Sequence, residues 1–325
     1  MHMPDALISP AVAVPGLVAA GAALAFACRK AAREVDNRRV PLMGVLGAFV
    51  FAAQMINLPV VVLPGVSWHL VGAVLMVVLL GPYSSFIVMA AVLTMQALLL
   101  GDGGLLALGC NVLNMGIVSC FLAYGVYATA VSWADTPRGR AVAVVLAAVA
   151  SSSAAALAAA AEIHLSGKNP VTFASAAWLM GSIHFVFGFG EAALTVAALA
   201  LIRKARPAAA EAQSESERKM MRRFAIGGLA VSLVIGGIVS WWASSSPDGL
   251  EHTAGVLKWP EGGNAFAGLL APVQKVLGSE PFVANAIVGL TTTALAFAVA
   301  MTISAAISRS KARANCDAAD PPEAA

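Results

Sequence analysis

The 325-residue chain contains little charge. Asp, Glu, Lys and Arg make up only 11% of it, whereas hydrophobic residues make up 59%. A soluble domain carries roughly 25% charged residues, and a soluble fold with so few could not cover its surface with polar groups. The composition therefore excludes an ordinary cytosolic enzyme and a disordered protein, and it predicts a chain that lies in a lipid bilayer.

Several motifs of catalysis and of disulfide scaffolds are missing as well. The four cysteines have no CxxC spacing, so we expect no disulfide framework. The sequence has no G-x-x-x-x-G-K-[ST] loop to cradle ATP, and no GxSxG, HExxH or Gly-rich dinucleotide motif. Nothing in the sequence therefore argues for an enzyme, and ATP-driven transport would need ATP hydrolysis by another protein.

Long apolar runs are what the sequence has in abundance. A helix needs about 20 apolar residues to cross a bilayer core. We find nine such runs, at residues 11–28, 41–57, 69–81, 84–100, 105–131, 141–161, 177–202, 224–243 and 282–307. They predict an all-α, polytopic membrane helical bundle with a tight turn at Gly81-Pro82 between the third and fourth spans.

The basic residues predict the orientation of these spans. With nine spans, 17 of the 20 Lys and Arg residues fall on one side, and only Lys168, Lys258 and Lys275 fall on the other. Positive charge favours the cytoplasmic side of a membrane. We therefore expect the N-terminus outside and the C-terminus in the cytoplasm, as a multi-pass protein of the plasma (bacterial inner) membrane.

The runs and the polar stretches between them divide the chain. Residues 1–202 form a seven-span part, and residues 203–223 form an Ala-rich, charged cytoplasmic linker. Residues 224–307 form a two-span part around an outside segment, and residues 308–325 form a cytoplasmic tail. We find no internal repeat, so an inverted-repeat transporter has no support in the sequence.

The amino terminus has the donors of a planar metal chelate. The amine of Met1, the amide nitrogen of His2 and the His2 imidazole Nδ1 close adjoining five- and six-membered rings around one cation. Planar nitrogen coordination suits Ni(II) and Cu(II), whereas zinc prefers a tetrahedron. The chelate needs Met1 as the terminal residue, which the bulk of His2 favours, and one more imidazole would complete four nitrogens. The alternative is that His2 is an exposed tail residue.

Several further motifs together resemble a known family. The opening Met1-His2-Met3-Pro4-Asp5 is similar to that of the nickel and cobalt substrate-binding proteins of energy-coupling-factor (ECF) transporters, the NikM/CbiM type. The resemblance continues in order through the segments 53–60, 67–72, 80–82, 96–104 and 109–116, and through His184 with 190–192. Ser246-Pro247-Asp248-Gly249-Leu250-Glu251 contains the PDGLE signature of the small N-type partner subunit, so the whole resembles a fused NikMN arrangement.

The resemblance implies both a site and a function. It implies a square-planar metal site from Met1, His2 and His69 in a seven-span M-type domain with an inserted N-terminus. It implies Ni(II) as the transported substrate, with Co(II) as the alternative. It also implies three kinds of partner, namely cytoplasmic ECF ATPase subunits, a transmembrane coupling subunit and the lipid bilayer, and no nucleic acid. Trp68 stands where the family usually has a small residue, which could narrow the path to the site.

Other polar residues leave alternatives open. Asn57, Asn111 and Asn114 are expected to hydrogen-bond between helices. The alternative is that they hold the N-terminal segment, for which Asn57 is the best candidate, and Asp102 is a further candidate for that role. Glu191 lies mid-span, two helical turns after His184, and we favour a structural hydrogen-bonded pair over a proton pathway. A stand-alone proton-coupled metal transporter that uses Glu191, and a membrane metal sensor, remain the rival functions.

Overall fold

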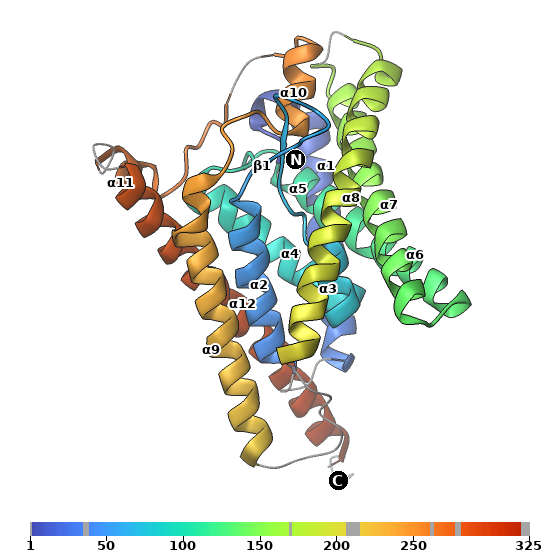
Figure 1. Cartoon of the computed structure of the whole chain (residues 1–325), viewed down its shortest axis with the longest axis vertical. Helices are drawn as coiled ribbons and strands as arrows, with labels where there is room; N and C mark the ends of the chain where they lie inside the picture. The colour runs from blue at the N-terminus through green and yellow to red at the C-terminus, as the bar shows by residue number, and fades with distance from the viewer. Residues whose placement is uncertain are drawn as a thin grey trace, which may run out of the picture.

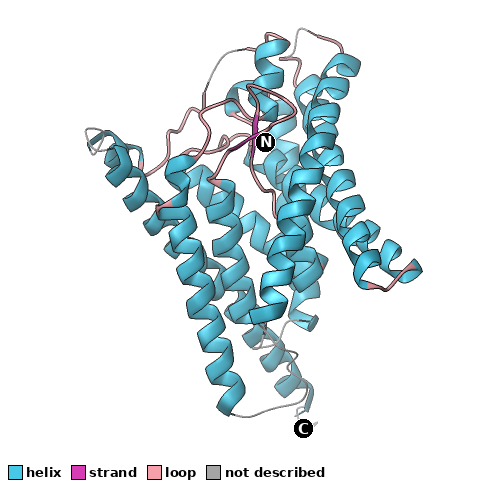
Figure 2. Cartoon of the chain, in the orientation of Figure 1, coloured by secondary structure: helices cyan, strands magenta, loops and turns pink. Residues whose placement is uncertain are grey.

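The structure is a computed structural model that describes residues 2–34, 39–168, 171–205, 215–260, 263–276 and 281–319. In this part of the chain almost all regular structure is helical (Figure 2). Seven segments are long and apolar enough to cross a membrane: Pro10–Glu34, Pro82–Leu100, Leu108–Trp133, Pro137–Leu165, Phe173–Ile202, Met220–Trp242 and Pro281–Ser310. The prediction of an all-α polytopic membrane protein is confirmed.

The long helices run up and down a single bundle (Figure 1). In chain order the helices of the bundle, long and short, are α1 (Pro10–Glu34), α2 (Val40–Gln54), α3 (Ala73–Leu80), α4 (Pro82–Met95), α5 (Leu108–Asn111), α6 (Ser119–Trp133), α7 (Pro137–Leu165), α8 (Phe173–Ala205), α9 (Glu215–Gly237) and α12 (Pro281–Ala319). Short elements cover the upper end or join helices: η1 (Asp5–Leu7), the antiparallel strands β1 (Leu58–Pro59) and β2 (Ser67–Trp68), η2 (Gln96–Leu100), η3 (Val112–Val118), η4 (Val239–Trp242), α10 (Gly249–Val256) and α11 (Ala271–Val276).

The third apolar run differs from its prediction. Residues 69–72 are not helical, and α3 has only 8 residues, about 12 Å at the helical rise, which is too short to cross a bilayer alone. Gly72 precedes α3 with a φ of 83°, a left-handed conformation that ends regular structure and suits glycine. The tight turn is confirmed, because Gly81 ends α3 and Pro82 begins α4.

Two α-helices of the bundle continue as π-helices. After α4 the chain continues as the π-helix η2, and α5 continues as the π-helix η3. A π-helix is wider than an α-helix and is frequent at functional sites. Gln96 opens η2, and Asn111 directly precedes η3, so both unusual segments begin at residues that reach the N-terminal segment.

The core lies around α2, which is buried along nearly its whole length. Helices α4, α9 and α12 pack against it, so the last two long helices share a core with the first part of the chain. Small residues allow this packing, because a Cβ on Gly47 would come within 2.8 Å of the Ala300 side chain. Large apolar side chains such as Val18, 67% exposed on α1, suit contact with lipid.

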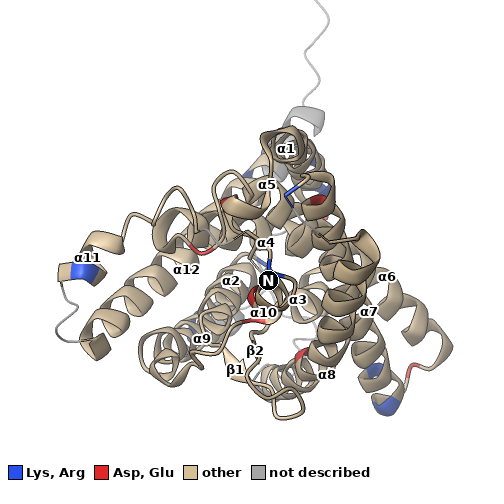
Figure 3. Cartoon of the chain, turned by 90° about the horizontal axis from the view of Figure 1, so that it is seen from above, with Lys and Arg blue, Asp and Glu red and all other residues tan. Residues whose placement is uncertain are grey.

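The N-terminal segment lies at the end of the bundle opposite the last described turns of α12 (Figure 1). Seen from above, it lies over the centre of the bundle beside α10 (Figure 3). The loops around β1 and β2 lie at the same end (Figure 2). Residues that are far apart in the sequence therefore meet at this upper end.

Candidate metal centre

The N-terminal segment is inserted into the upper end of the bundle. The Met3 amide donates to Asn111 Oδ1 at 2.9 Å, and Asn111 Nδ2 donates back to the Met3 carbonyl at 3.1 Å. The Gly104 amide donates to the same carbonyl at 3.0 Å, and the Met3 side chain is fully buried. These contacts place the neighbouring residue, His2, inside the protein.

Asp5 fixes the segment to two loops. Its Oδ1 accepts from the amides of Leu106 at 2.8 Å and Ala107 at 3.2 Å. Its Oδ2 accepts from the Ala265 amide at 3.2 Å. Gly104 leaves the space that this carboxylate occupies, because a Cβ there would collide with it. The N-terminal segment is therefore held both by the loop after η2 and by the segment before α11.

The structure brings His2 and His69 together. Their rings stack with centroids 5.2 Å apart and an angle of 23° between the planes. Each side chain is only 6% exposed. Met1 lies outside the described residues. Two of the three residues that the sequence predicts for the site are thus neighbours in the fold, although 66 residues separate them in the chain.

The two ring nitrogens of His2 face different groups. Nε2 lies 3.1 Å from Gln96 Oε1. A carbonyl oxygen only accepts, so this contact holds the hydrogen on Nε2 and leaves the lone pair on Nδ1. Nδ1 lies 3.4 Å from Oδ1 of Asp102, whose side chain is 42% exposed. Gln96 therefore selects the tautomer in which Nδ1 can bind a cation.

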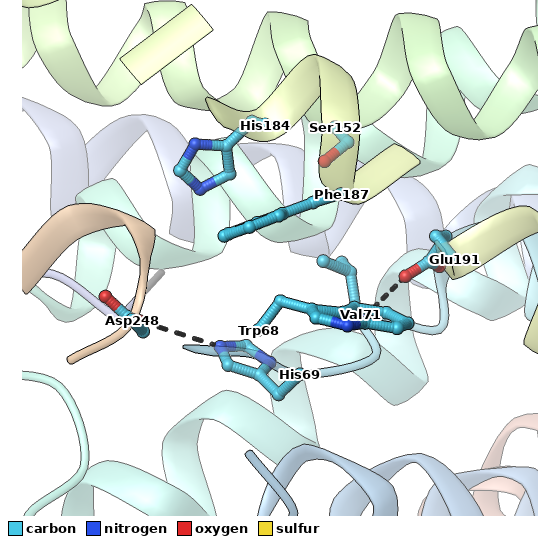
Figure 4. Close-up of a pocket in the computed structure, with 8 residues that line it drawn as sticks. All are labelled: Trp68, His69, Val71, Ser152, His184, Phe187, Glu191 and Asp248. Atoms are coloured by element: carbon cyan, nitrogen blue, oxygen red, sulfur yellow. Dashed lines mark hydrogen bonds and ion pairs between the residues drawn. The ribbon is translucent and has the colours of Figure 1, made fainter. Parts of the chain in front are cut away.

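His69 lies between β2 and α3 and faces Asp248 (Figure 4). Its Nδ1 is 3.5 Å from the Leu70 carbonyl, and its Nε2 is 3.9 Å from Asp248 Oδ2. A small cavity lies beside them, lined by Trp68, His69, Val71, Ser152, His184, Phe187, Glu191 and Asp248. Its free volume of about 10 Å³ is about what one water molecule needs.

Burial changes the protonation of these groups. Burial lowers the pKa of His2, and this effect is larger than the opposite effect of the Asp102 charge, which raises it. Burial also lowers the pKa of His69 well below the ordinary value, and nearby positive charge lowers it further. Burial opposes ionisation of Asp248, but neighbouring positive charge outweighs it and holds the pKa of that carboxyl below its usual range. Both imidazoles are therefore neutral near pH 7, as metal ligands must be.

Two predictions about the asparagines need correction. Asn111 holds Met3 rather than another helix, whereas no described contact joins the Asn57 side chain to the N-terminal segment. Asn57 instead accepts from the Ser244 amide through its carbonyl, at 2.7 Å. The prediction for Asn114 is confirmed, because its Nδ2 donates to Glu162 Oε2 on α7 at 2.6 Å.

Glu191 and His184 do not form the predicted pair. The Glu191 carboxylate accepts from the amides of Val71 at 2.7 Å and Gly72 at 2.9 Å (Figure 4). His184 Nδ1 lies 2.9 Å from the Met180 carbonyl. The amides that Glu191 binds stand at the start of α3, where the backbone has no helical acceptors. Glu191 therefore stabilises the interrupted third run from the neighbouring helix α8.

Sequence reasoning assigned no role to three residues of this region. Asp5 and Gln96 lie in motifs that carried the family resemblance, but nothing in their spacing indicated which atoms they would contact. Asp248 had a local signal, since Asp248 and Glu251 form a capping box at the start of α10, and D-x-x-E before a helix predicts one. That signal predicts the cap and not the approach to His69.

The match to protein families decides the chain's identity. Residues 2–209 match the family described as CbiM, cobalt uptake substrate-specific transmembrane region, and residues 222–309 match the PDGLE domain. The chain belongs to the CbiM family. Members of this family are components of nickel or cobalt transport, so the resemblance seen in the sequence is confirmed.

Individual CbiM-family relatives agree with this assignment. A fused nickel transport protein NikMN from Archaeoglobus fulgidus is 31% identical over 299 residues, which cover 92% of this chain and 96% of the relative. A fused nickel transport protein NikMN from Rhodobacter capsulatus is 30% identical over 249 residues, covering 76% and 63%. The crystal structure of a truncated transition metal transporter is 31% identical, with a TM-score of 0.56, and the match covers 63% of this chain and 99% of that one.

Proposed function

We propose that this chain is the substrate-binding component of an ATP-driven Ni(II) uptake transporter. The Met1 amine, the His2 amide nitrogen, His2 Nδ1 and a His69 nitrogen bind the metal in one plane. The observation that carries the proposal is the 5.2 Å stacking of His2 on His69 in a buried setting.

Nickel is the proposed substrate, with cobalt as the alternative. Planar four-nitrogen coordination suits Ni(II), and both of the fused relatives described above are named for nickel transport. The family itself is described by cobalt uptake. A comparison of Ni(II) and Co(II) affinity on the same purified protein decides between the two metals.

The proposal also covers orientation and partners. The distribution of Lys and Arg puts the N-terminal face outside the plasma (bacterial inner) membrane, so the metal binds from outside. Residues 1–202 act as the metal-binding domain and 224–307 as the accessory domain, in line with the two family matches at 2–209 and 222–309. Partner ATPase subunits and a membrane coupling subunit supply the energy, because the sequence has no ATP-binding loop.

The experiment compares the native protein with a version extended by three residues before Met1. We expect the native form to bind about one Ni(II) per chain with the absorption of a planar nitrogen site, and the extended form to lose that site because its Met1 nitrogen is an amide. Mass spectrometry of the native form checks that Met1 is terminal. Equal binding by both forms would rule out the terminal chelate.

A further inference from the structure

A carboxylate from the accessory part of the chain reaches the proposed metal site. The two carboxylate oxygens of Asp248 have different contacts. Oδ1 accepts from the amides of Leu250 at 2.8 Å and Glu251 at 2.9 Å, which caps α10. Oδ2 faces His69 Nε2 at 3.9 Å (Figure 4). Capping therefore engages Oδ1, whereas Oδ2 is the oxygen that lies nearer to His69.

The position of Asp248 is fixed by contacts between the two parts of the chain. The Ser67 amide donates to the Pro247 carbonyl at 2.9 Å, and Ser67 Oγ donates to the Ser246 carbonyl at 2.7 Å. Ser67 is itself fully buried. It lies two residues before His69, so the same short stretch of backbone that carries His69 also holds the segment that carries Asp248.

His69 and Asp248 lie close together without a hydrogen bond between them. At 3.9 Å the two atoms are too far apart for a hydrogen bond. The Leu70 carbonyl near Nδ1 favours a hydrogen on that nitrogen, which puts the lone pair on Nε2. A metal ion bound at Nε2 of His69 therefore lies close to the Asp248 carboxylate, and the negative charge of Asp248 attracts it.

The charge of the proposed site needs such a partner. A divalent cation with one deprotonated amide nitrogen leaves a net charge of about +1, and burying an unpaired charge is costly. Asp102 is 42% exposed, so solvent screens it. The Asp248 side chain is only 12% exposed, so solvent screens the interaction between its charge and the metal ion only weakly.

We propose that Asp248 supplies the anionic partner of the bound metal ion, so that the accessory part completes the metal site. This inference rests on the proposed function. It assigns a ligand-binding role to a residue in the PDGLE domain, and it means that the two parts of the chain form one site.

The test is Asp248→Asn in the full chain. Asn caps helices as well as Asp does, so the variant keeps α10 and removes only the charge. We expect its Ni(II) affinity, measured by competition with a chromophoric chelator, to fall about 10–100-fold, the loss typical of groups that support metal ligands. The matched variant Asp102→Asn removes an exposed charge and is expected to cost at most about fivefold.

A third variant separates charge from capping. Glu251 Oε2 accepts from the Asp248 amide at 3.0 Å, so Glu251→Ala removes this half of the capping box and leaves the Asp248 carboxylate in place. Affinity that falls as far in Glu251→Ala as in Asp248→Asn would overturn the inference, and so would unchanged affinity in Asp248→Asn. If wild type and the N-terminally extended form bind alike, the proposed function fails instead, so the two failures are distinguishable.

Discussion

Buried polar groups at the upper end of this protein differ from those inside the bundle. At the upper end, His2 and His69 stack on each other and each faces a carboxylate with one ring nitrogen. Inside the bundle, both Glu191 oxygens accept from backbone amides, and His184 Nδ1 lies at a backbone carbonyl. Burial of an ionisable group alone therefore does not indicate a transport role. What distinguishes His2 and His69 is that each has a stacked imidazole and a nearby carboxylate.

This difference bears on the rival function of a proton-coupled transporter. A carrier must release and rebind its proton, whereas Glu191 is engaged by Val71 and Gly72 at the start of α3. A carboxylate that stabilises a helix start loses that contribution when it is protonated. Glu191 is therefore better suited to hold the segment that carries His69 than to carry protons.

The comparison is tested most strongly by His69→Ala and His184→Ala. Loss of His69 removes a proposed ligand, so we expect the Ni(II) affinity to fall more than about 100-fold, beyond the loss typical of a group that only orients a ligand. Loss of His184, a buried side chain, is expected to lower the thermal midpoint while Ni(II) affinity stays close to wild type. Calorimetric titration and thermal unfolding in detergent measure both, and similar affinities in the two variants would contradict the comparison.

A smaller effect is expected from Gln96→Leu, with Gln54→Leu as the control. Both glutamines are buried, but only Gln96 contacts His2, whereas Gln54 Nε2 donates to the Val71 carbonyl at 2.8 Å. Without Gln96 the His2 tautomers are no longer fixed, and we expect a Ni(II) affinity loss of about tenfold. Nitrogen chemical shifts of His2 report the tautomer directly. A change of tautomer in Gln54→Leu, or none in Gln96→Leu, would be evidence against this role.

The smallest effect is the pH dependence of stability without metal. The folded pKa values of His2 and His69 lie below the ordinary value of 6.5, so the unfolded chain binds more protons than the folded chain as the pH falls below about 6.5. Stability contributed by the neutral imidazoles is therefore complete above that pH and decreases below it. We expect the thermal midpoint to fall from pH 7.5 to 5.5, and to fall less in the His2→Ala, His69→Ala double variant.

Hydropathy predicted most of the membrane-spanning helices, but it was wrong for the third apolar run. Counting apolar residues finds segments that prefer lipid, but it does not report the backbone conformation. The run 69–81 is apolar throughout most of its length, yet Gly72 and the distant Glu191 carboxylate hold residues 69–72 out of the helix. The pattern of apolar residues likewise does not indicate the π-helices at 96–100 and 112–118.

The candidate site was predictable only in part. The chelate at residues 1–2 follows from local covalent geometry, because its donors are adjacent in the chain. His69 came from family resemblance, and the structure brings it to His2. Gln96 and Asp248 act through tertiary contacts across 94 and 179 residues, and a sequence read one segment at a time gives no distance between such residues.

The contacts of Asp5 have a consequence for the order of events during synthesis. Asp5 N donates to Asn264 Oδ1 at 3.0 Å, Ala265 N donates to Asp5 Oδ2, and Asn264 Nδ2 donates to the Gly101 carbonyl at 2.6 Å. A ribosome makes the N-terminal end first, so residues 2–107 leave it long before residue 264 exists. A nascent chain can therefore form the contacts of Met3 and Asp5 with residues 104–111 early, whereas the contacts with Asn264 and Ala265 must wait until that later segment has been made.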